Sequence, residues 1–228
     1  MPDTPPHPNL LPSLGRLARG LSAVFWGLPA ALILCITAGA RVEIFRATGI
    51  LPAIFALGLL FYGLVMMGDF QRQERPWRLA LDRARLLALV NLGLSPFLFF
   101  NNRMPGQPLF FWSVALLAVS GLMFLYNLNF VLLRLAEMLP DETLRHEARQ
   151  FTALNRGLII AMTILAAVFF IVPFLTRLPL WLILLHDMIS LYRIFALVPL
   201  LILPLAMTMA LLWKTKEVIL ESVFGARD

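Results

Sequence analysis

Charged residues divide this chain into long apolar blocks. Six windows contain no Asp, Glu, Lys or Arg, and each window is between 17 and 30 residues long. They cover residues 20–40, 47–68, 86–102, 104–133, 157–176 and 194–213. A helix needs about 20 apolar residues to cross a hydrocarbon layer about 30 Å thick. The pattern therefore predicts helices that span a membrane.

We expect an all-α, polytopic integral membrane protein with one domain of six transmembrane helices over residues 21–213. The expected spans are residues 21–40, 49–67, 86–100, 109–133, 158–175 and 194–213. Prolines inside several spans predict kinks, because proline cannot donate the helical hydrogen bond. Residues 1–20 are expected to form a mobile, proline-rich tail, because five of the 16 prolines lie in its first 12 positions. Residues 214–228 are expected to be a cytoplasmic helix or tail.

Three segments between the spans predict short amphipathic helices at the two membrane faces. Residues 69–85 are basic, and Pro76 suits the first turn of a helix that runs on into the third span. Residues 141–156 carry apolar side chains at helical spacing, so this segment either lies at the inner face or joins the fifth span. Residues 178–192 predict a helix in the outer interface or one part of a long broken helix.

The composition agrees with a membrane environment. Of the 228 residues, 60% are hydrophobic and only 14% are charged, and the mean hydropathy is +0.83. An average soluble domain is about a quarter charged. These values exclude a water-soluble enzyme and a disordered chain. Cys35 is the single cysteine, which excludes an intramolecular disulfide.

The distribution of basic residues predicts the orientation. With the N-terminus in the cytoplasm, 14 Lys and Arg residues fall in the inner segments and 5 in the outer ones. Cytoplasmic loops carry such an excess, so we expect both termini in the cytoplasm, at the inner or plasma membrane. The net charge of +6 then reflects topology. No basic stripe alternates with surface aromatics, and we expect no nucleic-acid partner.

The most regular polar pattern lies in the fourth span, where four polar residues recur every seven positions and so share one helix face. These residues are Ser113, Ser120, Asn127 and Arg134. Asn129 beside them and Asn91 in the third span extend this candidate binding face. Such a face belongs toward the bundle interior or toward a water-filled path. The pattern fits hydrogen bonds that hold helices together, and it also fits a path for a solute, an ion or a lipid.

Two further groups of residues are candidate sites. His186, Asp187 and Arg193 form a possible outer-interface cluster, although neighbouring side chains on a helix diverge by about 100°, so catalysis needs partners from elsewhere. Five arginines of the inner loop are candidate contacts for anionic lipid headgroups, because each basic residue near an anionic leaflet contributes about 1 kcal/mol. They are Arg72, Arg75, Arg78, Arg83 and Arg85.

No sequence motif for catalysis, for nucleotide binding or for metal ligation is present, so we expect neither a cofactor nor a metal. The expected spans also contain no charged residue of the kind that proton-coupled carriers commonly place at mid-membrane. We therefore expect a non-catalytic membrane subunit or scaffold. Its expected partners are membrane lipids, together with another protein or a second copy of the chain.

Two other functions stay open at this stage. One is a pore or facilitator for a small solute or ion, lined by the polar face of the fourth span. The other is a membrane-embedded enzyme that acts on a lipid-like substrate at the outer interface.

Overall fold

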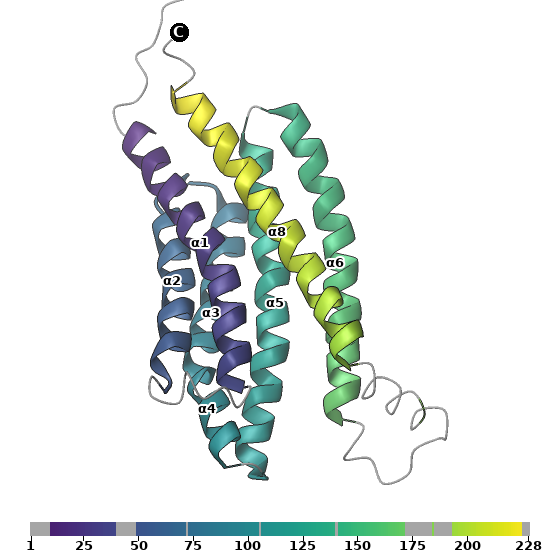
Figure 1. The fold of residues 1–228 in the computed structure, drawn as a ribbon. Helices are drawn as coiled ribbons and strands as arrows, with labels where there is room; N and C mark the ends of the chain where they lie inside the picture. Colours follow the sequence, from purple (N-terminus) through teal and green to yellow (C-terminus); the bar gives the residue numbers. More distant parts are fainter. Residues whose placement is uncertain are drawn as a thin grey trace, which may run out of the picture.

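The computed structural model is a bundle of long helices (Figure 1), with no strand in the part of the chain that it describes. Helices make up 92% of the described residues, which confirms the all-α prediction. The structure describes residues 10–39, 49–71, 73–104, 106–139, 141–171, 184 and 193–224.

Except for α4, which has 8 residues, the described helices are long compared with those of most soluble proteins. They are α1 (Leu10–Gly39), α2 (Leu51–Met67), α3 (Arg75–Leu94), α4 (Pro96–Arg103), α5 (Pro108–Met138), α6 (Glu142–Ile171) and α8 (Arg193–Phe224). Within the described residues, four stretches are long and apolar enough to cross a membrane: Pro12–Ala38, Arg75–Arg103, Pro108–Met138 and Glu142–Val168. Helix α2 is a shorter apolar helix of 17 residues. By length and composition, the chain thus has several candidate membrane spans.

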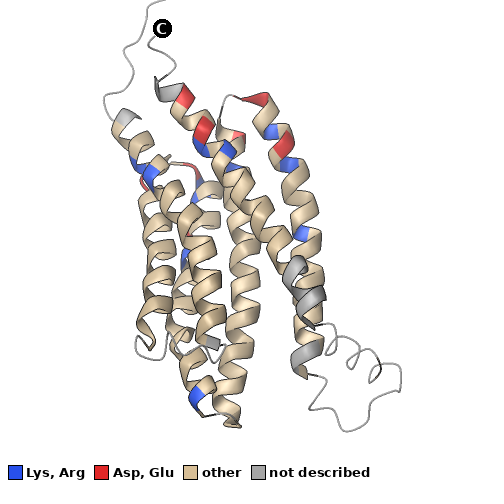
Figure 2. Ribbon diagram, viewed as in Figure 1, with Lys and Arg blue, Asp and Glu red and all other residues tan. Residues whose placement is uncertain are grey.

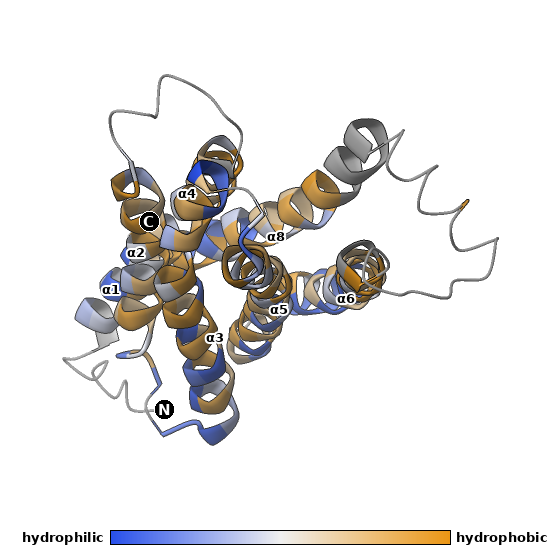
Figure 3. Cartoon of the chain, turned by 90° about the horizontal axis from the view of Figure 1, so that it is seen from below, coloured by the Kyte–Doolittle hydropathy of each residue, from blue (hydrophilic) through white to orange (hydrophobic). Residues whose placement is uncertain are grey.

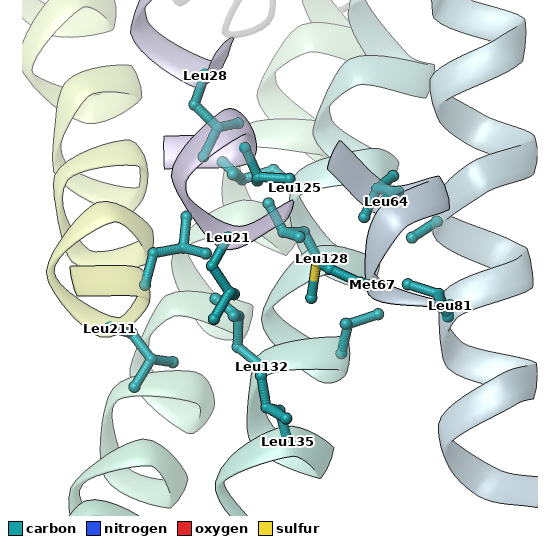
Figure 4. Packing of buried hydrophobic residues seen from close by; sticks show 14 of the residues in the cluster. Leu21, Leu28, Leu64, Met67, Leu81, Leu125, Leu128, Leu132, Leu135 and Leu211 are labelled. Atoms are coloured by element: carbon teal, nitrogen blue, oxygen red, sulfur yellow. The ribbon is translucent and has the colours of Figure 1, made fainter. Parts of the chain in front are cut away.

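Helix α5 lies near the middle of the bundle (Figure 3), where it packs against α3 on one side and α6 on the other. Helix α1 packs along α2 and crosses α8. Leucines dominate the buried core between these helices (Figure 4), and Leu21, Leu64 and Leu128 there are inaccessible to solvent. The core therefore joins α1, α2 and α5 directly.

Charged residues gather at one end of the bundle, where α1 begins and α8 ends (Figure 2). Ion pairs between described residues connect different elements at this charged end: Arg16 with Asp69, Arg149 with Glu137, and Lys214 with Glu147. The helix shafts beyond are almost entirely uncharged (Figure 2). A polar end and an apolar shaft match the aqueous boundary and the hydrocarbon layer of a bilayer.

Helix α1 corrects the expected boundary of the N-terminal tail. It begins at Leu10, so residues 10–20 are helical and belong to the bundle. Pro12 is tolerated because the N–H groups of a first helical turn have no partner within the helix. Leu17 and Leu21 are fully buried at a spacing of four residues, so the apolar face of the span extends toward the N-terminus.

The two inner segments form the first turns of long helices, one of the two arrangements that the sequence left open for residues 141–156. Helix α3 begins at Arg75, with Pro76 in its first turn as expected. It ends at Leu94, and only Ser95 separates it from α4, which begins at Pro96. Helix α6 runs without interruption from residue 142 to residue 171, which joins the segment 141–156 to the fifth span. Packing explains this, because Trp77 and Leu144 are buried in the protein core.

Asp141 caps the start of α6. Its Oδ1 accepts hydrogen bonds from the Thr143 hydroxyl at 2.6 Å and from the backbone N–H groups of Thr143 and Leu144 at 2.8 and 3.1 Å. The Thr143 hydroxyl, followed by the Leu144 amide, lowers the pKa of Asp141 below its ordinary value. The lowered pKa means that the cap stabilises the fold at neutral pH and that this contribution is lost as the pH falls through the Asp141 pKa.

The remaining boundaries differ modestly from the expected spans. Helix α5 continues five residues beyond the expected end at residue 133, and α8 continues from the sixth span through Phe224. The end of the fifth span at 172–175 and the segment 178–192, except for Leu184, lie outside the described residues.

Candidate functional site

A cavity of about 480 Å³ lies inside the bundle, in the half away from the charged end. Its walls come from all seven described helices and are almost entirely apolar; Leu28, Leu57, Leu117, Met162 and Leu205 are representative. Protein pockets for small ligands have volumes of about 300–1,000 Å³. The cavity is therefore large enough for a ligand, and its walls suit an apolar one.

Small side chains create this space. Ala31, Ala118, Gly121 and Ala166 line the cavity on three helices. A Cβ atom built on Gly121 would meet no atom within 4 Å. Ile36 also lines the cavity and is 53% exposed, so the cavity is open at the edge beside α1. Leucines at the small positions would fill much of the volume.

Asn91 is the one amide side chain on the cavity wall among the described residues. Its Oδ1 accepts a hydrogen bond of 2.5 Å from the Ser120 hydroxyl, and both side chains are buried. This bond joins α3 to α5. Asn91 and Ser120, which sequence analysis placed on the same candidate face, thus bond to each other. Asn91 lines the cavity, whereas Ser120 does not.

The structure does not bring the fourth-span polar residues together around one path. Ser113 donates to the Leu109 carbonyl and Asn127 to the Met123 carbonyl, each at 2.8 Å within α5 itself. Neither of these side chains is buried, whereas Ser120 is. The pore function therefore stays a prediction.

A second polar cluster joins α5, α6 and α8 and is fully buried. Asn129 donates to the Thr208 hydroxyl oxygen at 2.9 Å and to the Leu125 carbonyl at 2.8 Å. The Asn155 amide nitrogen lies 3.0 Å from Asn129 Oδ1, 2.9 Å from Thr208 Oγ1 and 3.1 Å from the Pro204 carbonyl oxygen. All three residues are at most 1% exposed.

Sequence analysis found Asn129 but missed Asn155 and Thr208. Asn155 lies in the segment expected outside the membrane, and Thr208 is a lone hydroxyl in an apolar run. A signal did exist in the sequence. Ala148, Thr152, Asn155 and Ile159 follow one another at spacings of three or four residues, which places them on one helix face. All four are buried in the structure. The cluster secures α8 beside the cavity, since Leu205 of α8 lies on the cavity wall.

Arg85 is directed toward α2. Its guanidinium donates to the Leu64 carbonyl at 3.0 and 3.2 Å and to the Val65 carbonyl at 3.1 Å, which satisfies backbone groups in the last turn of α2. By contrast, Arg75, Arg78 and Arg83 are exposed, as a headgroup contact requires.

Several candidate residues cannot be placed. Arg72, His186 and Asp187 lie outside the described residues, and Arg193 begins α8 with only its backbone described. Arg134 pairs with Glu137 on the same helix, at 2.7 Å.

Within the described ranges, no three His, Cys, Asp or Glu side chains come together as a metal site requires. The candidate site is therefore the apolar cavity, with the Asn91–Ser120 bond at its wall and the buried cluster of α5, α6 and α8 beside it. Comparisons with protein families, with curated proteins and with solved structures find no match to this chain.

Proposed function

We propose that this chain is a non-catalytic membrane subunit or scaffold and that it binds the apolar chain of a lipid in its cavity. The observation that carries the proposal is the cavity itself, with a volume of about 480 Å³ and an almost entirely apolar wall. An apolar cavity of this kind stays dry and favours apolar ligands. The opening beside Ile36 would admit a chain from the surrounding lipid.

The polar groups near the cavity favour a lipid chain over a solute or an ion. A permeation path needs polar groups that replace the hydration of the solute. Asn91 and Ser120, however, already bond to each other, and the cluster of Asn129, Asn155 and Thr208 connects helices. The wall thus offers mainly dispersion contacts and the burial of apolar surface, which is what an acyl or isoprenoid chain requires.

The proposal includes six spans, with both termini on the cytoplasmic side of the inner or plasma membrane. Four stretches are long and apolar enough to span a membrane, and α2 and α8 would be the fifth and sixth spans. The 17 residues of α2 reach about 26 Å, a shortfall that a bilayer accommodates by thinning. The charged end supports this orientation, and the prolines inside α1 and α8 are the proposed kinks.

Filling the cavity is expected to abolish lipid binding without unfolding the protein. Gly121→Leu directs a side chain into the open space beside Gly121. The measurement is cross-linking of the purified protein by a fatty acid with a photoreactive group midway along its chain, with the labelled peptide identified by mass spectrometry. We expect labelling near Leu117 or Met162 in the unmodified chain and a loss of about tenfold or more in Gly121→Leu, since a clash of about 1.4 kcal/mol already weakens binding tenfold.

Gly58→Leu is the matched control, because Gly58 also has no atom within 4 Å of its Cβ position but does not line the cavity. Labelling by the fatty acid should be unchanged in this variant. Equal labelling of Gly121→Leu and the unmodified chain, or labelling confined to side chains outside the cavity, would contradict the proposed function.

The proposed orientation predicts that both inner segments react from the same side. In a Cys35→Ser chain, single cysteines introduced by Arg78→Cys and Glu217→Cys occupy exposed positions at the charged end. A membrane-impermeant maleimide should label both positions in inside-out vesicles and neither in right-side-out vesicles. Labelling of the two cysteines from opposite sides would overturn the six-span arrangement.

A further inference from the structure

A row of arginines lies where α5 packs against α6 at the charged end. Arg134 comes from α5, whereas Arg145, Arg149 and Arg156 follow one another on one face of α6. Among the described residues, Glu137 is the one carboxylate paired with any of them. We refer to these four arginines and Glu137 as the arginine groove.

The contacts of the arginine groove leave guanidinium groups without a negative partner. Glu137 binds Arg134 at 2.7 Å and Arg149 at 3.6 Å. Arg145 donates to the Leu139 carbonyl at 3.2 Å, and Arg156 donates to the Tyr126 hydroxyl at 2.6 Å. Counting only the part of the chain that the structure describes, four arginines and a single glutamate leave three positive charges without a paired carboxylate.

Two donors in the arginine groove are also unused. The Nε atoms of Arg134 and Arg145 are buried and have no hydrogen-bond partner among the described residues. Buried donors are normally satisfied, and an unsatisfied one on a charged group is costly. A ligand with several acceptor oxygens and a negative charge would use the guanidinium groups that the protein leaves free.

The position of the groove indicates where such a ligand comes from. Arg156 follows Arg145 by 11 residues, which is about 16 Å along α6. The row thus extends from the α5–α6 loop into the helix that continues to Ile171, while the Arg156 guanidinium lies over the Tyr126 ring at 5.0 Å from its centre. An arginine close to the apolar part of a span is stabilised by an anionic headgroup at the interface.

We propose that the arginine groove binds the phosphate of an anionic phospholipid. Guanidinium groups bind phosphate oxygens through paired, charge-assisted hydrogen bonds, so several of them along one groove fit a phosphodiester headgroup. This site is separate from the five inner-loop arginines and from the cavity. It rests on the proposed membrane placement but not on the proposed cavity ligand.

Removing two groove charges tests the site. The measurement is native mass spectrometry of the purified full chain titrated with dioleoyl phosphatidylglycerol, with dioleoyl phosphatidylcholine as the neutral-headgroup comparison. The unmodified chain should retain the anionic lipid preferentially. Each arginine contributes about fivefold in affinity at an anionic surface, so Arg149→Gln with Arg156→Gln should weaken phosphatidylglycerol binding about 25-fold and leave phosphatidylcholine binding unchanged.

Two controls separate binding from folding and from general charge. Arg19→Gln with Lys216→Gln removes the same charge from α1 and α8 at the same end of the bundle but outside the groove, so it should change binding less than about twofold. Arg149→Lys with Arg156→Lys keeps the charge but loses the paired hydrogen bonds of the guanidinium groups, so its affinity for phosphatidylglycerol should lie between those of the glutamine pair and the unmodified chain.

Three outcomes would overturn the site. They are full phosphatidylglycerol binding by the glutamine pair, an equal loss in the Arg19 and Lys216 control, and complete competition by millimolar inorganic phosphate, which would indicate a free-phosphate site. Gly121→Leu should leave headgroup binding intact. Failure of the arginine groove and failure of the proposed cavity ligand can therefore be told apart.

Discussion

Replacing Gly63 with leucine is expected to separate α1 from α2 and to lower the free energy of unfolding by about 3 kcal/mol. The two helices cross where Gly20 and Gly63 face each other. A Cβ atom on Gly63 would lie 2.9 Å from the Gly20 carbonyl oxygen and 2.8 Å from a Val24 methyl group. Since one of these atoms belongs to the backbone, the helices themselves must move apart.

Gly58→Leu is the control for this prediction, since Gly58 lies on the same helix with no atom near its Cβ position. The measurement is thermal unfolding of the two variants and the unmodified chain in the same detergent. We expect Gly63→Leu to lower Tm by several degrees and Gly58→Leu to leave it nearly unchanged. Equal Tm values for the two variants would mean that the close approach of α1 and α2 contributes little to stability.

Charge-free windows predicted the helical class and most helix positions, because the cost of burying charge in hydrocarbon is large and shows in composition alone. Helix ends were harder to predict. Pro76 was expected in the first turn of a helix that continues into the third span, whereas the sequence left open whether residues 141–156 lie at the inner face or join the fifth span. In the structure Trp77 and Leu144 bury their apolar faces in the protein. Only tertiary packing distinguishes a helix on a lipid surface from the first turns of a longer one.

The seven-residue polar pattern of α5 gave a partial prediction of the site. Ser120 of this pattern is buried against Asn91. Ser113 and Asn127 instead bond to the carbonyl four residues earlier in their own helix, as a hydroxyl or an amide can. Such a residue needs neither a helix partner nor water, so its periodicity does not reveal a path.

The cavity could not have been predicted from the sequence. Its volume depends on small residues that lie far apart in the chain, such as Ala31, Gly121 and Ala166, coming to face the same space. Each of these residues alone is typical of close helix packing, as Gly20 and Gly63 show. Whether a small residue brings helices together or leaves a void depends on the neighbouring helix.

Replacing Asn155 with aspartate is expected to have the largest effect of any change in the buried cluster of α5, α6 and α8. The Asn155 amide nitrogen faces Asn129 Oδ1 and the Pro204 carbonyl oxygen, which can only accept hydrogen bonds. A carboxylate in its place would bring negative charge against these oxygens in a site that is inaccessible to solvent. We expect a loss of about 4 kcal/mol in the free energy of unfolding at neutral pH.

The pH dependence separates this charge effect from the loss of the Asn155 hydrogen bonds. A carboxyl group introduced by Asn155→Asp carries the unfavourable charge only while it is ionised. Stability of this variant, measured as Tm in detergent, should therefore recover as the pH is lowered. Asn155→Leu removes the same donor without a charge, and its loss should be about 1–2 kcal/mol and independent of pH. Equal losses for the two variants at neutral pH would contradict the charge effect, because the carboxyl group would then cost no more than the lost hydrogen bonds.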